Sequence, residues 1–317
     1  MTKSFIVHEV DVTAARYFSL RGAVSSPIRV FQLDDFGISR EDFLNRIAPT
    51  FHNLPLDPYD AALAAERLIK SQAPDLYRRH ESDWLVFWNE LADLRYTDPC
   101  AGPEFWSQHI SSDDVLEGLA SIRPYRRRSS FQYLAKPNSA SEYRWYLQEV
   151  GTPTFVQAVA DERSRPRRFA ASPMTVYRDQ DVLSLIAVTC QLIRQTASVL
   201  ATTMRVTLHQ MLTYADNSAG REPAPEGTHQ DGSAFIISAL VIERANVGGG
   251  VSRIFYTKDN GLALENELQP GYGIFQSDTH NQYWHQVTTV YPLDSTKTAY
   301  RSILGLDIDF VKDMRAA

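Results

Sequence analysis

The sequence predicts a mainly β protein with helices: a double-stranded β-helix (jelly roll) core with an N-terminal and flanking helical layer. The core is expected at residues 204–310, where short β-type runs are separated by turn signals such as Asn260-Gly261. Several short strands at this spacing favour a closed antiparallel sandwich or barrel over an open parallel sheet. The helical layer is expected because amphipathic patterns precede the core, the longest at about residues 179–202.

The elements before the core mix short strands with helices. Apolar runs at residues 4–10 and 28–33 predict two strands, and the Ala-rich run at 58–72 predicts a helix. Further helices are expected near residues 39–47, 82–94 and 113–122, followed by an arginine-rich strand at 126–134. The aromatic residues of segment 82–94 recur at helical spacing, so we expect them to pack in a core.

The chain is expected to form one domain. A length of 317 residues would suit two average domains, but β-rich single domains also reach such lengths. No repeat, low-complexity tract or linker divides the sequence. We therefore expect a single domain over residues 1–317, with an N-terminal α/β layer over about 1–200 and the jelly-roll core over about 201–311.

The composition is that of a folded globular protein without a strongly basic surface. Hydrophobic residues make up 44% and charged residues 22%, and 32 Lys and Arg against 38 Asp and Glu give a net charge of -6. This balance argues against nucleic acid or an anionic membrane as a partner. No run approaches the roughly 20 apolar residues of a membrane span, and the first residues do not resemble a signal peptide. We therefore expect a cytoplasmic protein.

One short motif has the pattern of a metal site. In the run PEGTHQDG at residues 225–232, His229 and Asp231 are two positions apart, so on a strand both side chains would point to one face. They would supply two ligands of a 2-His-1-carboxylate triad, which leaves open positions on iron(II). The third ligand is expected on a later strand. His285 is favoured over His280, because the β-type run VTTVY follows it directly.

A single arginine on the last predicted strand is a candidate anion-binding residue. Arg301 lies 16 residues after His285, and strand alternation places it on the opposite face from Leu304 and Leu306. A buried guanidinium is costly unless it meets an anion. The distal carboxylate of 2-oxoglutarate is the expected partner.

Three polar residues on the strand that opens the core are further candidates. His209 is expected to neighbour the motif and is a candidate substrate-binding residue. Gln210 and Tyr214 lie on the other face of the same strand and are candidates to reach 2-oxoglutarate.

Two arginine clusters precede the core. One covers residues 126–128, and the other lies within 163–168. Both are compatible with a solvated surface paired to carboxylates, or with one arginine that binds a substrate carboxylate through a bidentate fork. Arg167 and Arg168 are the substrate-binding candidates of the second cluster.

Together these features resemble the iron(II)- and 2-oxoglutarate-dependent dioxygenases. The resemblance rests on PEGTHQDG, the GGGVS strand at residues 248–252, the H-x-V-T pattern at His285 and the strand of Arg301, and it is clearest over about 155–310. Within the family, the chain is similar to the branch of free amino acid hydroxylases typified by bacterial L-isoleucine 4-hydroxylase. Segment 278–284 is longer than the usual approach to the distal histidine, which keeps His280 open as an alternative.

The resemblance implies a jelly-roll core and a set of ligands. Iron(II) would be held by the residues matching His229, Asp231 and His285, and 2-oxoglutarate by the residue matching Arg301. Dioxygen would be the oxidant. The resemblance thus implies an enzyme that hydroxylates an unactivated C–H bond of a free L-amino acid or small derivative, with succinate and CO2 as co-products.

Other functions fit parts of the same pattern. The same oxidation could end in desaturation or cyclisation of a small metabolite. A cupin-like small-molecule binding protein would have the fold without redox activity, and a zinc hydrolase could use the same three ligands. Asp231 argues against halogenation, in which a small residue replaces the carboxylate. In every case the expected partner is a small molecule, and nothing in the sequence indicates the oligomeric state.

Overall fold

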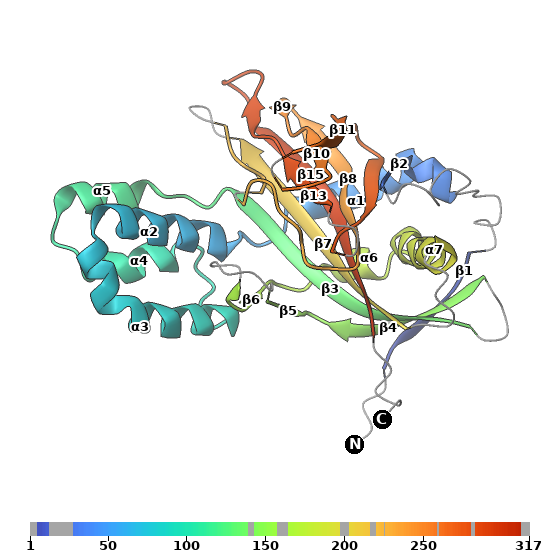
Figure 1. Cartoon of the computed structure of the whole chain (residues 1–317), viewed down its shortest axis with the longest axis horizontal. Helices are drawn as coiled ribbons and strands as arrows, with labels where there is room; N and C mark the ends of the chain where they lie inside the picture. Colours follow the sequence, from blue (N-terminus) through green and yellow to red (C-terminus); the bar gives the residue numbers. More distant parts are fainter. Residues whose placement is uncertain are drawn as a thin grey trace.

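An eight-stranded antiparallel sheet, here called the main sheet, organises this computed structural model (Figure 1). Its strand order is β1-β4-β3-β7-β15-β8-β12-β2. The strands are β1 (Val7–Asp11), β2 (Ile28–Gln32), β3 (Arg126–Pro137), β4 (Arg144–Gly151), β7 (Met204–Ala215), β8 (Phe235–Ala245), β12 (Tyr272–Ser277) and β15 (Ala299–Phe310). The structure describes residues 5–12, 28–138, 143–156, 164–196, 203–215, 220–224, 226–258, 260–279 and 283–311.

Shorter strands form a second layer over one face of the main sheet. They are β9 (Val247–Gly249), β10 (Ser252–Phe255), β11 (Leu262–Asn266), β13 (Trp284–Val287) and β14 (Val290–Pro292), paired as β11-β10-β13 and β14-β9. Ala239 and Ile274 of the main sheet pack against Ile254 of this layer in one buried cluster. A separate two-stranded pair joins β5 (Thr154–Phe155) to β6 (Arg167–Arg168). The predicted jelly-roll class with a helical layer is confirmed.

Helices cover the other face of the main sheet. α1 (Arg40–Phe51) contacts β7 and β8, and α7 (Gln180–Thr196) contacts β1 and β4. Leu185 of α7 and Leu208 of β7 are fully buried in the same apolar cluster. The short helices η2 (Leu33–Phe36) and α6 (Met174–Tyr177) complete the described part of this layer. Removal of these side chains from water is the main stabilisation of the layer.

Four more helices form a lobe beside the sheet (Figure 1). They are α2 (Pro58–Gln72), α3 (Pro74–Ala92), α4 (Ala101–Ser107) and α5 (Asp113–Ser121). Trp84, Trp88 and Trp106 are buried in a cluster that belongs to this lobe. α2 and α4 approach closely at Gly102, where a Cβ atom would lie 2.6 Å from the Ala62 Cα. Within the described ranges, no helix is both long and apolar enough to cross a bilayer.

Side-chain alternation gives the main sheet two different faces. β7 and β15 pair along their whole length without a register shift. Leu208 and Leu306 therefore point toward the helices, where both are fully buried. Met211 and Arg301 point to the opposite face, where both line a cavity. This face carries the candidate site.

Some predicted boundaries differ from the observed ones. The helix expected at 82–94 begins at Pro74, because proline is favoured in the first helical turn. The strand expected from residue 229 begins only at Phe235, because Gly232 has a φ of 93° and the residues before it form a loop. β1 to β4 precede residue 200 but belong to the same sheet as β7, so a division at residue 200 does not follow a sheet boundary. The single-domain organisation stays a prediction.

Glu66 on α2 is a buried carboxylate that ties the helical lobe together. It accepts hydrogen bonds from Arg165 (2.8 and 2.9 Å) and Tyr77 (2.8 Å), and pairs with Lys70 at 2.9 Å. Burial raises the pKa of Glu66, but Arg165 and Lys70 more than compensate and lower it from 4.5 to about 2. The ionised form therefore stabilises the folded state.

We predict that Glu66→Gln lowers the free energy of unfolding at neutral pH by about 3 to 5 kcal/mol, because Arg165 loses its buried partner. The folded pKa is depressed, so this contribution is complete above about pH 4.5 and is lost as the pH falls toward about 2. Urea unfolding should therefore show that the difference in unfolding free energy between the wild type and Glu66→Gln becomes smaller as the pH falls from about 4.5 to about 2. Glu117→Gln, at an exposed position of α5, is the control. A difference that does not change with pH would contradict this role.

Candidate active site

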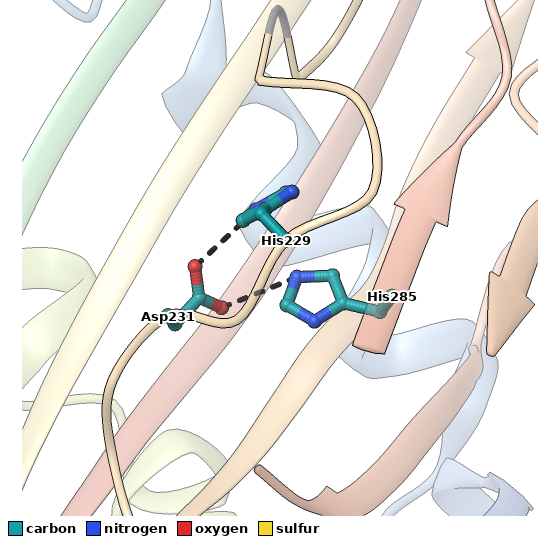
Figure 2. A group of neighbouring side chains, drawn as sticks. All are labelled: His229, Asp231 and His285. Atoms are coloured by element: carbon teal, nitrogen blue, oxygen red, sulfur yellow. Dashed lines mark ion pairs between the residues drawn. The ribbon is translucent and has the colours of Figure 1, made fainter. Parts of the chain in front are cut away.

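Two backbone hydrogen bonds bring the predicted histidines together. His229 N donates to His285 O at 2.9 Å, and His285 N donates to His229 O at 2.8 Å. The two residues form an isolated antiparallel bridge between the loop before β8 and strand β13. Their ring centroids lie 4.3 Å apart. Both imidazoles therefore project into the same space (Figure 2).

Asp231 completes the group. Its Oδ1 lies 3.5 Å from His229 Nε2, and its Oδ2 lies 3.4 Å from His285 Nε2. Figure 2 shows the carboxylate directed at both rings. One candidate ligand atom from each residue lies within 4.8 Å of the other two. Two histidines and one carboxylate at this spacing could hold a divalent metal ion and leave coordination positions open.

The backbone next to His229 determines which ring nitrogen faces the group. His229 Nδ1 lies 2.9 Å from Gly227 O, so Nδ1 carries the proton and Nε2 keeps its lone pair. Gly227 has a φ of 67°, a left-handed conformation that suits glycine. Contacts of this kind commonly orient metal-binding histidines. The local conformation of residues 226–232 thus leaves Nε2 available for a metal.

Asp278, just after β12, contacts the loop that carries Asp231. It is fully buried, and its Oδ2 accepts hydrogen bonds from Gly232 N (2.7 Å) and Ser233 N (3.2 Å). Its Oδ1 lies 4.0 Å from His285 Nδ1. Asp278 therefore fixes the loop that follows Asp231 and faces the far side of the His285 ring. The sequence analysis missed this residue, although an acid directly after a buried strand was a usable signal.

The charges of the group are strongly coupled. Burial raises the pKa of Asp231, but His285 and His229 lower it below its ordinary range. Burial lowers the pKa of His229, but Asp231 raises it to about 9. Burial and the charge of His229 lower the pKa of His285 to about 4. A divalent cation in this position would take over the role of the proton as the partner of Asp231.

A cavity of about 110 Å³, here called the Arg301 cavity, is lined by all three residues and by Arg301. Arg301 is 3% exposed, and its Nε and Nη2 have no hydrogen-bond partner within the described ranges. Burial and the neighbouring Arg244 lower the pKa of Arg301 to about 9. An unsatisfied guanidinium in a small cavity fits a carboxylate ligand.

Gly250 makes room for this arginine. A Cβ atom at Gly250 would lie 2.9 Å from Arg301 Cδ and 3.2 Å from Arg301 Nε, and its φ of 67° also disfavours other residues. The hydroxyls of Thr213, Ser238 and Ser252 line the same cavity and offer further donors. The residues present therefore fit a small dicarboxylate whose other end reaches a metal held by the triad.

A second cavity of about 300 Å³, here called the larger cavity, adjoins the first. Its walls share His229, Asp231 and Met211 with the Arg301 cavity. Its lining also includes seven further charged residues: Arg126, Arg128, Arg167, Arg205, Glu226, Asp307 and Asp309. A substrate bound here would lie next to the triad without occupying the Arg301 cavity.

Gln210 and Tyr214 do not reach either cavity. Gln210 is fully buried on the helix-facing side of the main sheet, where it donates to Thr50 Oγ1 (3.0 Å) and accepts from Ser129 Oγ (3.2 Å). Tyr214 lies on the same face of β7 and contacts the ring of Tyr300. The expectation that they contact 2-oxoglutarate is therefore wrong. The apolar side chains of β7 point toward the helices, and both residues share their alternation.

The other candidates divide between the site and its surroundings. His209 faces the site side of the sheet, where its Nε2 lies 2.8 Å from Asp307 Oδ2. Arg167 lines the larger cavity, whereas Arg168 points away from it and donates to Thr152 Oγ1 at 3.2 Å. The alternative ligand His280 lies outside the described residues.

The first arginine cluster also contributes to the larger cavity. Arg126 pairs with Asp57 at 3.3 Å and Asp60 at 3.9 Å, so its charge is already compensated. Arg128 stacks over Phe169 at 4.2 Å, and burial lowers its pKa. No ion pair joins Arg128 to a carboxylate in the part of the chain that the structure describes. Arg128 is thus the better candidate for an anion in this cavity.

Comparisons with known proteins show which family this chain belongs to. The family described as 2OG-Fe dioxygenase matches residues 105–307. A search of the curated proteins found no match. Among solved structures, the Fe(II)/(alpha)ketoglutarate-dependent dioxygenase TqaL has a TM-score of 0.51 at 11% identity, over 93% of this chain and 87% of its own. A bsmA homolog from Methylobium petroleophilum PM1 has a TM-score of 0.50 at 21% identity, over 58% and 72%. IDO from Bacillus thuringiensis has a TM-score of 0.48 at 16% identity, over 59% and 79%.

We predict that Asp278→Asn weakens iron(II) binding about 10- to 100-fold, because the loop after Asp231 and the His285 ring lose their common support. Anaerobic titration with iron(II), or with cobalt(II) as a coloured substitute, measures the affinity. Asp113→Asn, at the exposed start of α5, is the control. An unchanged affinity in Asp278→Asn would show that this carboxylate does not position the ligands.

Proposed function

Since the chain belongs to the 2OG-Fe dioxygenase family, we propose that it hydroxylates an unactivated C–H bond of a free L-amino acid or a small amino-acid derivative. Its cofactors are iron(II), 2-oxoglutarate and dioxygen. One oxygen atom of dioxygen enters the substrate as a hydroxyl group, and the other enters succinate as 2-oxoglutarate loses CO2. The observation that carries the proposal is that one cavity is lined by a His-Asp-His group and by a buried arginine whose Nε and Nη2 find no hydrogen-bond partner among the described residues.

In this proposal His229, Asp231 and His285 hold iron(II). Their ligand atoms already lie within 4.8 Å of one another, and Nδ1 of His229 is engaged by Gly227 O, which leaves Nε2 for the metal. With its co-substrates, the bound iron supplies the oxidising power. The protein supplies the geometry: it fixes three ligands and leaves the remaining positions toward the two cavities.

Arg301 holds the distal carboxylate of 2-oxoglutarate. The guanidinium and the triad line the same cavity of about 110 Å³, which suits a short dicarboxylate between them. The charge of the ligand offsets the desolvation that lowers the pKa of Arg301. The buried position also keeps water from competing for the guanidinium.

The substrate occupies the larger cavity. Arg128 and Arg167 line it, and burial lowers the pKa of both guanidinium groups. A substrate carboxylate would relieve this cost through charge-assisted hydrogen bonds. The shared wall at His229 and Asp231 then brings the bound molecule next to the iron. This arrangement supports a small anionic or zwitterionic substrate.

We predict that His229→Ala, Asp231→Ala and His285→Ala each lose at least 100-fold of 2-oxoglutarate-dependent succinate formation, because each removes one of three metal ligands. Circular dichroism should show that the variants remain folded. His280→Ala is the matched control. The assignment of the third ligand is wrong if His285→Ala keeps its activity while His280→Ala loses it.

We predict that Arg301→Ala raises the apparent KM for 2-oxoglutarate about 100-fold or more, since loss of one partner of a buried charge pair costs about 3 to 5 kcal/mol. Succinate release measured across 2-oxoglutarate concentrations gives this constant. Arg144→Ala, on a half-exposed position of β4, serves as the control. An unchanged KM in Arg301→Ala would remove Arg301 from the 2-oxoglutarate site.

We predict that free amino acids stimulate succinate release together with a mass gain of one oxygen atom. Methylation of the substrate carboxylate should lower kcat/KM about tenfold or more, because a buried arginine then lacks its anion. The measurement compares free amino acids, their methyl esters and short peptides by mass spectrometry. Esters or peptides that react as well as the best free acid would contradict the substrate class. A binding protein or a hydrolase would form no succinate at all.

A further inference from the structure

Two neighbouring carboxylates on one strand of the larger cavity have no role in the proposed reaction. Asp307 and Asp309 lie two positions apart on β15, so their side chains leave the same face of the main sheet. Both line the larger cavity together with His229 and Asp231. Their side chains are therefore presented to the molecule that binds next to the triad.

Both carboxylates have room for further donors. Asp307 Oδ2 lies 2.8 Å from His209 Nε2. Asp309 accepts hydrogen bonds from Ala234 N (3.0 Å) and Ser233 Oγ (3.2 Å). A carboxylate has about four lone-pair sites, so neither group is saturated. Over the described ranges, no arginine or lysine forms an ion pair with either of them.

Arg205 is a cation close enough to act electrostatically on Asp309. Arg205 lies opposite Asp309 in the register of β7 and β15. Its residue is exposed, and it forms no ion pair with Asp309 within the described part of the chain. Asp309 is itself half-buried, and burial raises its pKa. A carboxylate in such a place gains most from a cationic ligand that is enclosed with it.

Arg128, another cation of the larger cavity, lies farther along the main sheet from Asp307 and Asp309 than Arg205 does. Arg128 on β3 is paired with Met211 of β7, whereas Asp307 is paired with Thr207. Thr207 and Met211 are four positions apart on β7, so the row of residues beside Thr207 and the row beside Met211 are separated by about 13 Å along the strand. The Arg128 guanidinium also stacks on Phe169, next to Arg167. Arg128 and the two aspartates therefore line different parts of the cavity, whose walls also carry Arg205 and Glu226.

Building on the proposed function, we propose that the substrate is a basic amino acid. Its α-carboxylate binds Arg128 and Arg167, and its terminal ammonium or guanidinium group binds Asp307 and Asp309. The α-ammonium group is only one carbon away from the carboxylate, so it does not bridge the two rows. The side chain of lysine, ornithine or arginine has the required length and places its methylene groups between the two charged ends, beside the triad.

An aliphatic amino acid would fill the same cavity poorly. It would remove water from Asp307 and Asp309 without bringing an opposite charge, and loss of hydration without a compensating charge is costly for a carboxylate. Sites built to hydrogen-bond a substrate group reject analogues that lack this group far more strongly than apolar pockets reject a missing methylene. The terminal cation is therefore the main determinant of selectivity.

The experiment compares lysine with norleucine, which has the same carbon chain but no terminal ammonium group. With iron(II) and 2-oxoglutarate, we expect a KM for lysine, ornithine or arginine at least tenfold below that for norleucine and leucine. Norleucine or leucine used equally well or better would overturn this inference but leave the proposed function intact. If no amino acid stimulates succinate release, both are wrong.

Two variants test the carboxylates directly. Asp309→Asn and Asp307→Asn keep the side-chain shape but remove the charge. In each variant, the fold-increase in the KM for lysine relative to the wild type should be at least ten times the fold-increase in the KM for norleucine. Asp113→Asn, on α5, is the control. Two independent positions keep the test valid if one variant fails to fold, which circular dichroism will show.

A binding measurement provides a second readout that does not depend on turnover. In oxygen-free samples with iron(II) and 2-oxoglutarate, lysine should raise the melting temperature of the wild type, because a ligand that binds only the folded state stabilises it. The rise should be lost in Asp309→Asn and Asp307→Asn. If both variants bind lysine as the wild type does, the carboxylates do not recognise the substrate.

Discussion

The unshifted register between β7 and β15 is the constraint on which the rest of the structure depends. Because side chains alternate along a strand, one set of positions on both strands points to the helices and the other set to the cavities. Leu208 and Leu306 belong to the first set, and Met211 and Arg301 to the second. A slip of one residue would exchange the two faces, moving leucines into the site and charges into the core.

The polar face explains why charged residues are buried here at all. Arg301, Arg128 and Asp231 lie in places where burial alone opposes their charged forms. A charge in such surroundings costs free energy unless an opposite charge accompanies it. Asp231 has two histidines beside it, while the two arginines face cavities. The proposed metal, co-substrate and substrate would supply the missing charges. Their binding would therefore remove the free-energy cost of burying these groups.

Local chemistry and long-range packing contribute to the triad in different ways. Gly227 and Gly232 shape the loop around His229 and Asp231, and this part of the site is encoded within eight consecutive residues. His285 comes from the second layer and reaches the loop through the backbone bridge to His229. Asp278 then connects the two parts, since it contacts the loop and faces the His285 ring.

The sequence by itself determined the jelly-roll class, the candidate triad and the position of Arg301 on the face opposite Leu304 and Leu306, because these depend on spacing and alternation that neighbouring residues define. The orientation of Gln210 could also have been predicted from the sequence, because Gln210 has the same alternation as Leu208 and Leu212 and therefore faces the helices. Only the tertiary structure decided that Asp278 faces His285 and that Arg128 and Asp307 line one cavity. Arg128 and Asp307 are far apart in the sequence, and they line one cavity because β3 and β15 both pair with β7. Asp278 and His285 are close in the sequence, but they belong to different layers of the fold, and only the packing of these layers turns one toward the other.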